Sequence, residues 1–389
     1  MTFAGFRVLA VSACVAVLGL MTAAVPRVLA QGALTPPPGP IEPCMKTLDQ
    51  IAPSVPVAAV DFPLIISQPG SYYLTETVFF DDSLTSDAIT ITSDNVTLDM
   101  NGFSLIYASR GVTKSQQDGE ARGFLPAGIR VFFDFGQFTP KGSDTGFFFG
   151  LSGIRVTNGS IVGFPGEGYS GDEGYAAVLE NMHFRQNGND GARLGPGGVI
   201  RNCTALLNGR DGILSREYST LDGCTAGLNG FSGFCVGPGG TITNSNAYEN
   251  LQNGIYGMGD STRIRNCVAT LNGQDGIRVV NDSVVEGCTA NFNGTTGVGS
   301  GVRATVGRNR LESNTTMSNI KGVSVDSNGF GNLVVKNNSG GNVAGNYVVD
   351  TSRNAFAPVS TLGFVASPLR GGPTFTAGPW DNFELFEQN

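Results

Sequence analysis

The stretch that decides the fold is Asn272-Gly-Gln-Asp-Gly-Ile-Arg-Val-Val-Asn-Asp-Ser-Val-Val-Glu-Gly-Cys-Thr-Ala290. It holds two short apolar runs, around Ile277 and Val285, with turn residues on either side of each. Similar stretches precede it in the chain. Self-similarity at a fixed period is typical of an array in which each unit buries its apolar side against the next.

Two positions mark the period of the repeat. The first recurs at spacings of 21, 21, 21, 22 and 21 residues. It is occupied by Met182, Cys203, Cys224, Ser245, Cys267 and Cys288. The second position holds Asn187, Asn208, Asn229, Asn250, Asn272 and Asn293. We expect both to be structural ladders, because stacked strands lie about 4.8 Å apart and stacked asparagine amides bond along their column. The cysteines should be buried free thiols, since parallel Cβ vectors suit disulfides poorly.

The repeat predicts an all-β fold: a right-handed parallel β-helix with three strands and about 21–22 residues per coil. Other solenoids fit less well. Leucine-rich repeats need several leucines per unit, whereas Leu207, Leu228 and Leu271 occur singly. Calcium-binding nonapeptide coils need a repeated Gly-Gly-x-Gly-x-Asp motif, which the sequence lacks.

Composition divides the chain into segments. Residues 1–30 are typical of a secretory signal peptide, although the apolar run approaches membrane-spanning length and an uncleaved anchor stays open. Residues 31–60 are Pro- and Ala-rich, as in an extended linker. We expect the β-helix over 61–350, with a phenylalanine-rich insertion at 107–150. The tail, 351–389, should pack on the last coils or cap them.

Charge narrows the choice of partners. The formal charge is −8, and it becomes −10 when the two arginines of the signal segment are removed with it. An acidic protein without a Lys/Arg cluster is poorly suited to nucleic acid or anionic lipid. We therefore expect no nucleic-acid partner and no membrane span in the mature chain. The signal predicts a secreted, periplasmic or cell-surface protein.

A family resemblance rests on the motif Asn-Gly-x-Asp-Gly-Ile…Cys-Thr-Ala, whose first part lies at 208–213 and 272–277. It resembles the right-handed parallel β-helix proteins of the pectate-lyase-like superfamily. The segments 45–74 and 95–103, with the Pro-Trp-x-Asn-Phe ending, resemble a group of secreted bacterial β-helix proteins without an assigned reaction. The likeness covers nearly all of the mature chain. The superfamily implies polysaccharide lyases, glycoside hydrolases, esterases and epimerases, alongside non-enzymatic members.

No catalytic motif of that superfamily can be carried over. The only histidine, His183, stands outside a Gly-His-Gly motif. The Tyr-Gly-x-Asp-Pro-His segment of mannuronan-epimerase-like enzymes does not occur in the sequence. The main prediction is therefore a secreted protein with a binding or structural role, with polysaccharide or a cell-surface partner as the candidate ligand and no required cofactor.

The alternative is a lyase of pectate-lyase type, which needs carboxylates holding Ca²⁺ and an arginine base. Asp190 and Asp211 occupy the same turn position on adjacent coils, so they are the candidate calcium ligands. Arg193 is the candidate base. The competing interpretation is ordinary Asp-Gly turn chemistry, in which Asp bonds its own backbone and Gly takes a positive φ.

An outward column is expected beside these aspartates. It contains Arg193, Leu214, Cys235, Tyr256, Arg278 and Arg303. Tyr256 and Arg278 are the candidate binding residues within it. His183 is also predicted to point outward from its strand. The phenylalanines of the insertion are expected to pack against the helix or in an oligomer contact, because sugar platforms prefer Trp and Tyr.

Overall fold

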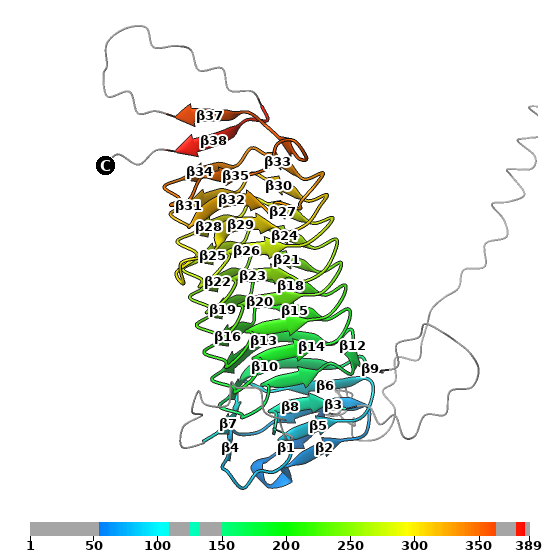
Figure 1. Cartoon of the computed structure of the whole chain (residues 1–389). Helices are drawn as coiled ribbons and strands as arrows, with labels where there is room; N and C mark the ends of the chain where they lie inside the picture. The colour runs from blue at the N-terminus through cyan, green and yellow to red at the C-terminus, as the bar shows by residue number, and fades with distance from the viewer. Residues whose placement is uncertain (1–53, 109–124, 133–149, 363–378, 386–389) are drawn as a thin grey trace, which may run out of the picture. The chain divides into compact units, whose positions relative to one another are not determined.

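The computed structural model describes residues 54–108, 125–132, 150–362 and 379–385. In these residues the chain forms stacked coils, each made of three short parallel strands (Figure 1). This confirms the predicted all-β solenoid. Strands that pair on consecutive coils start at Ala192, Ile213, Phe234, Ile255 and Ile277, which reproduces the spacing of 21 or 22 residues.

Two large parallel sheets and one small sheet contain the strands. The 12-stranded sheet has one strand per coil: β2 (Leu64–Ile66), β5 (Ile89–Ile91), β8 (Ile129–Val131), β11 (Tyr169–Gly171), β14 (Ala192–Leu194), β17 (Ile213–Ser215), β20 (Phe234–Val236), β23 (Ile255–Gly257), β26 (Ile277–Val279), β29 (Ser300–Ala304), β32 (Lys321–Val325) and β35 (Tyr347–Val348). The small sheet pairs β9 (Leu151–Ser152) with β12 (Gly174–Tyr175), and a 3-10 helix, η1, spans Ala59–Asp61.

The 24-stranded sheet takes the other two strands of each coil. It contains β1 (Ser54–Val57), β3 (Gly70–Leu74), β4 (Val78–Phe80), β6 (Val96–Asp99), β7 (Ser104–Tyr107), β10 (Arg155–Val162), β13 (Val178–Arg185), β15 (Val199–Arg201), β16 (Thr204–Leu206), β18 (Thr220–Asp222), β19 (Thr225–Gly227), β21 (Thr241–Thr243), β22 (Asn246–Tyr248), β24 (Arg263–Arg265), β25 (Val268–Thr270), β27 (Val284–Glu286), β28 (Thr289–Asn291), β30 (Arg310–Glu312), β31 (Thr315–Met317), β33 (Leu333–Val335), β34 (Asn338–Gly340), β36 (Ala355–Phe356), β37 (Val359–Leu362) and β38 (Asn382–Leu385).

The segment boundaries differ from the expected ones in two places. β1 lies within the range 31–60 that was predicted as a linker, and it pairs with β3. β8 lies within 107–150 and pairs with β5 and β11, so that range is not one insertion but includes a rung of the solenoid. The signal segment 1–30 lies outside the described residues. So do the insertion's phenylalanines other than Phe132.

The tail contributes strands to the last coils. β36 pairs with β33, and β38 pairs with β34 although more than forty residues separate them in sequence. Asn382 of β38 is fully buried, and its Oδ1 accepts a hydrogen bond from the backbone N of Asn337 at 3.0 Å. The described part of 351–389 therefore continues the sheet at this end of the solenoid.

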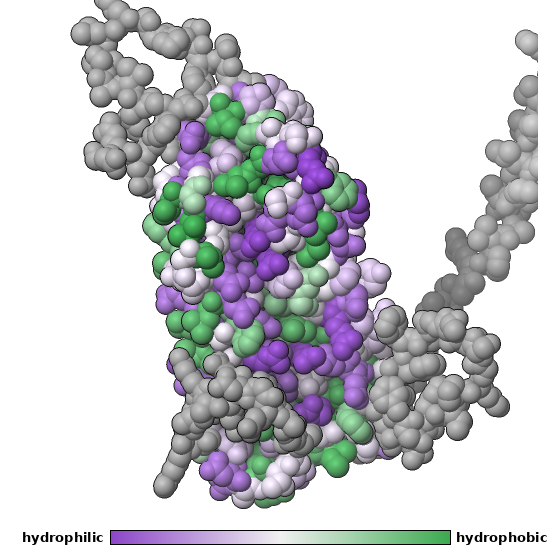
Figure 2. Space-filling view, in the orientation of Figure 1, coloured by the Kyte–Doolittle hydropathy of each residue, from purple (hydrophilic) through white to green (hydrophobic). Residues whose placement is uncertain are grey.

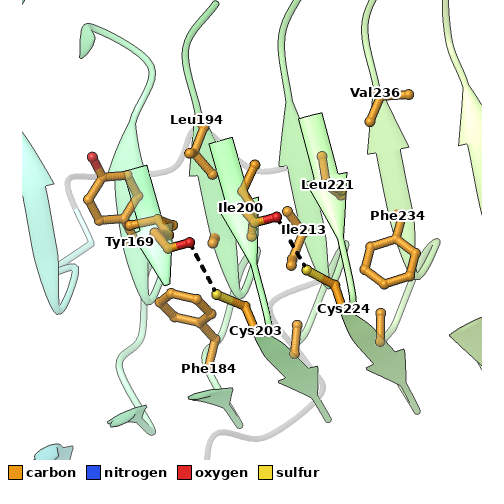
Figure 3. Packing of buried hydrophobic residues seen from close by; sticks show 14 of the residues in the cluster. Tyr169, Phe184, Leu194, Ile200, Cys203, Ile213, Leu221, Cys224, Phe234 and Val236 are labelled. Carbon is orange, nitrogen blue, oxygen red and sulfur yellow. Dashed lines mark hydrogen bonds between the residues drawn. The ribbon is translucent and has the colours of Figure 1, made fainter. Parts of the chain in front are cut away.

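The core is the interior of the coils, filled by the alternate residues of every strand. Ile213, Leu221 and Phe234 are completely buried there. Figure 3 shows Cys203 and Cys224 on neighbouring coils, packed among these side chains. Cys203, Cys224, Cys267 and Cys288 are all buried free thiols. Their Sγ atoms lie 3.2–3.7 Å from backbone carbonyl oxygens, which gives each thiol an acceptor in the core.

The corners between strands follow one rule. A residue in the left-handed region stands directly before each inward ladder residue. Asn202 (φ 52°) precedes Cys203, and Leu207 (φ 59°) precedes Asn208. Tyr218 (φ 59°) occupies the same place at the third corner. Asparagine tolerates this conformation, whereas Leu and Tyr are uncommon in it.

The asparagine column is a continuous hydrogen-bonded ladder. Oδ1 of Asn208 accepts from both the backbone N and the Nδ2 of Asn187, at 3.1 and 3.0 Å. Nδ2 of Asn208 also donates to the carbonyl of Phe184 at 3.2 Å. The same arrangement repeats on each coil through Asn319. These side chains are buried with their amide groups paired, as buried polar groups require.

The outer surface is mixed in character. On the face shown in Figure 2, hydrophilic side chains occur along the whole stack, with smaller hydrophobic patches between them. Among the described residues, no helix is long and apolar enough to cross a membrane.

Candidate functional site

The outward column of the 12-stranded sheet is the candidate site. Strand register places its members directly beside one another on successive coils. They are Arg193, Leu214, Cys235, Tyr256, Arg278 and Arg303. One member differs from the expectation: Cys235 is buried between Leu214 and Tyr256, and its Sγ donates to Oδ1 of Asp211 at 3.5 Å.

Tyr256 and Arg278 form a stacked pair in this column. The guanidinium carbon of Arg278 lies 5.0 Å from the centre of the Tyr256 ring, which is within cation–π range. Both side chains are half-buried. Within the described residues Arg278 makes no ion pair, and its Nε is buried without a hydrogen-bond partner. Its neighbour Arg303, in contrast, pairs with Asp326 at 2.8 Å and with Asp275 at 3.5 Å.

A row of buried carboxyl groups runs beside the column. Oδ1 of Asp190 accepts from the backbone N of Asp211 at 3.0 Å. Oδ1 of Asp211 accepts from Ser232 N at 2.9 Å. Three coils beyond Asp211, Asp275 makes the same bond, with its Oδ1 accepting from Ser300 N at 2.7 Å. Each aspartate therefore links its own coil to the next, instead of bonding its own turn as the turn interpretation expected.

The glycine after each aspartate is required by close approach of neighbouring coils. A Cβ on Gly212 would lie 2.6 Å from the carbonyl oxygen of Gly233, and one on Gly276 would lie 2.7 Å from that of Gly301. Neither Gly212 nor Gly276 has a positive φ. The expectation of a left-handed glycine at this place was therefore wrong, because packing between coils selects glycine here.

Comparison with known proteins agrees with this geometry. Residues 194–340 match the family model described as right handed beta helix region. The chain is a right-handed parallel β-helix. A comparison with curated protein sequences finds no match.

Solved structures with a similar fold include three of note. The A-module of the mannuronan C-5 epimerase AlgE6 of Azotobacter vinelandii has a TM-score of 0.56 and 16% identity, over 87% of this chain and 90% of that one. The Dettilon tailspike protein has a TM-score of 0.56 and 16% identity, over 77% and 62%. A double mutant of the periplasmic alginate epimerase AlgG has a TM-score of 0.55 and 12% identity, over 75% and 74%. At these identities the likeness shows the fold alone.

The carboxyl groups of this β-helix are held in an environment that favours their neutral form. Burial raises the pKa of Asp190 to about 7, and the nearby charge of Asp211 adds to the shift. Burial also raises the pKa of Asp211 and of Asp275 above the ordinary aspartate value. The row consequently carries less negative charge near neutral pH than its formal count implies.

Arg193 forms an ion pair with Asp172. Its Nε lies 2.6 Å from Oδ2 of Asp172, a residue in the turn after β11. Burial lowers the pKa of Arg193, but the charge of Asp172 and the hydrogen bond to it raise that pKa by more, so the net shift is upward. A general base accepts a proton, so an arginine in that role must first be deprotonated. The ion pair with Asp172 stabilises the protonated form of Arg193 instead. Asp172 could not be identified from the repeat, because it lies outside the repeated positions.

The candidate calcium ligands are together, but they are not arranged as an open site. Asp190 and Asp211 are 1% and 7% exposed. One carboxylate oxygen of each already accepts a hydrogen bond from a backbone N of the next coil. Among the residues described, no group of three or more His, Cys, Asp or Glu side chains has the placement to hold a metal ion. His183 is exposed on β13, as its strand position predicted.

Proposed function

We propose that this protein binds an acidic polysaccharide along the outer face of the 12-stranded sheet, with the Tyr256–Arg278 pair as the contact. Arg278 is the observation that carries the proposal. Its guanidinium is stacked and half-buried, and in the described part of the chain it has no ion pair. Guanidinium groups bind carboxylates and sulfates through paired donors, and a tyrosine ring offers an apolar face with a polar edge to a sugar.

The overall acidity of the chain does not oppose this proposal. Charges at the surface are screened beyond about 8–10 Å at physiological salt, so the local arrangement outweighs the net charge of −8. Near Arg278 the closest carboxyl group of the row is Asp275, whose pKa is raised by burial. Asp275 is also paired with Arg303 at 3.5 Å, so a ligand carboxylate meets the Arg278 guanidinium beside a carboxyl group that already has a partner.

The similar structures support a polysaccharide as ligand at a coarse level. The epimerases among them are named for mannuronan and alginate, which are acidic polysaccharides. The proposal includes export through the segment 1–30, so that the protein meets its ligand in the periplasm, at the cell surface or outside the cell. Cell fractionation with detection of the mature amino terminus tests that part.

A binding series tests the function. Purified protein is titrated with polygalacturonate, alginate and heparin, and with neutral dextran as the control polymer. We expect binding to the acidic polymers that weakens as salt increases, and about a tenfold loss of affinity for Arg278→Gln, the typical value of a charged hydrogen bond. Arg263→Gln is the matched control, because Arg263 is exposed on β24 of the other large sheet. Equal binding by both variants would remove Arg278 from the site.

The same samples decide between binding and lyase chemistry. A lyase produces unsaturated sugar ends, which are followed by ultraviolet absorbance with and without added Ca²⁺. We expect no product, because Arg193 is held protonated by Asp172. Calcium-dependent product that disappears in Arg193→Gln would replace the binding proposal with the lyase alternative.

A further inference from the structure

A second arginine–aromatic pair lies on the same side of the solenoid. The guanidinium carbon of Arg210 is 5.3 Å from the centre of the Phe231 ring. The two residues occupy the same corner position on adjacent coils, and the backbone N of Phe231 donates to the carbonyl of Arg210 at 3.0 Å. Both side chains are half-buried. As with Arg278, the described residues provide no ion pair for Arg210, and its Nε is buried without a hydrogen-bond partner.

Both pairs border the same row of carboxyl groups. The charge of Arg210 acts on Asp190 and Asp211, and that of Arg278 acts on Asp275. Arg210 is thus placed at one end of a stretch of the face, and Arg278 at the other. Between the two ends, the row positions on the intervening coils are held by the neutral residues Ser232 and Asn253.

The positions of the two arginine–aromatic pairs along the axis indicate what kind of ligand can contact both of them. Arg210 belongs to the coil of β17, and Arg278 belongs to that of β26, three coils further on. At about 4.8 Å per coil, their backbone positions are about 14 Å apart along the axis. Each guanidinium lies over a ring on one of the two coils between them: Arg210 over Phe231 on the coil of β20, and Arg278 over Tyr256 on the coil of β23. An extended polymer with repeated negative groups, lying parallel to the axis, reaches both.

We infer that Arg210 and Phe231 are a second anchoring subsite, so that the ligand is an extended acidic chain bound across at least the coils of β17, β20, β23 and β26. This rests on the proposed function, and it adds the direction of the chain and its minimum length. The negative groups are uronate carboxylates or sulfates, which guanidinium groups bind in the same way.

The test is a length series. Affinities are measured for oligogalacturonides, from the dimer to chains long enough to span three coils, and for heparin oligosaccharides of matched lengths. The proteins are wild type, Arg210→Gln, Arg278→Gln and the control Arg263→Gln. We expect wild-type affinity to rise with length until both pairs are spanned and then to level off. Arg210→Gln should lose about tenfold for long chains and nothing for chains that fit on the Tyr256–Arg278 pair alone.

The outcomes separate the two proposals. If Arg278→Gln weakens binding at every length while Arg210→Gln binds every length as wild type does, the second subsite is wrong and the proposed function stands. If both variants bind as Arg263→Gln does, both proposals fail. Phe231→Leu is the second probe of the same subsite, and it should reproduce the length-dependent loss. Thermal unfolding of each variant establishes that the fold is intact.

Discussion

At the scale of single residues, Asp190 shows how the stack uses a carboxylate as a backbone acceptor. Asn253 occupies the same row position two coils beyond Asp211, and its Oδ1 accepts from Asp275 N at 3.3 Å. At that coil an uncharged amide oxygen makes the bond that a carboxylate makes elsewhere in the row. Ionising a buried carboxyl group costs free energy because its charge is removed from water. An amide stays neutral and has no such cost.

We predict that Asp190→Asn stabilises the protein at and above neutral pH. The pKa of Asp190 is raised to about 7, so its protonated form is the one that the fold favours. That contribution is fully present below the unfolded-state pKa near 4 and is lost as the pH rises through 7. The advantage of the variant should grow from about pH 4 to pH 7 and reach at most about 4 kcal/mol.

Chemical denaturation across this pH range measures the effect. Asn253→Asp is the matched control, because it places a carboxyl group in the same row and should introduce the opposite pH dependence. Parallel stability curves for wild type and Asp190→Asn would show that the carboxyl titrates normally in the fold.

A second residue-scale prediction concerns Leu271. It is 44% exposed and has φ of 59°, so a large side chain holds a left-handed conformation without being buried. Asn244 and Asn266 take the same conformation at another corner with φ of 52°. Leu271→Asn should therefore raise the free energy of unfolding by about 0.5–1 kcal/mol. Leu271→Ala is the comparison, because alanine is as unfavourable as leucine in the left-handed conformation. Equal stability of the two variants would contradict the prediction that asparagine relieves this backbone strain.

At the scale of elements, the three corners of each coil hold neighbouring coils together. Each joins two short strands, and on many coils a side chain at the corner accepts a hydrogen bond from the backbone of the neighbouring coil. The column that contains Cys203 continues as Asn314, Asn337 and Asn382, so cysteine, serine and asparagine share one structural role. The strands themselves are three residues long in most coils, which leaves the corners to set the register.

We predict that Asn250→Ala is among the most destabilising changes in a ladder. It removes the acceptor of Asn229 N and Nδ2, at 3.2 and 2.9 Å, and leaves buried donors unpaired. The expected loss is about 2–4 kcal/mol in unfolding free energy. Ser245→Cys is the control, since cysteine already occupies this column, and it should cost about 1 kcal/mol or less. A similar cost for both variants would show that the ladder bonds add little.

At the scale of the whole molecule, the fold is an array in which each coil contacts its neighbours. The 12-stranded sheet presents one outward side chain per coil, and these align into a column that runs along the axis. A linear polymer matches such a surface better than a compact ligand does. Both proposed contacts lie beside the carboxyl row of this face.

Much of the architecture was predictable because the repeat is local. Each coil repeats the same pattern of ladder residue, corner and strand, so the period gave the parallel solenoid, the strand register and the buried cysteines. The candidate residues Tyr256 and Arg278 followed from the same register. The range 107–150 was misjudged, since β8 is too short to be recognised between two long segments without the period.

The amino-acid sequence by itself determined the coil, because the alternation of apolar residues and the recurring corner residues are encoded within each repeat. Only the tertiary structure decided which charged groups are available. Arg193 is neutralised by Asp172, and Arg303 by Asp326, through pairs that join positions 20 or more residues apart. Arg210 and Arg278 keep their guanidinium groups on aromatic rings instead. Ion pairing and burial depend on which residues neighbouring coils bring together, and no single repeat contains that information.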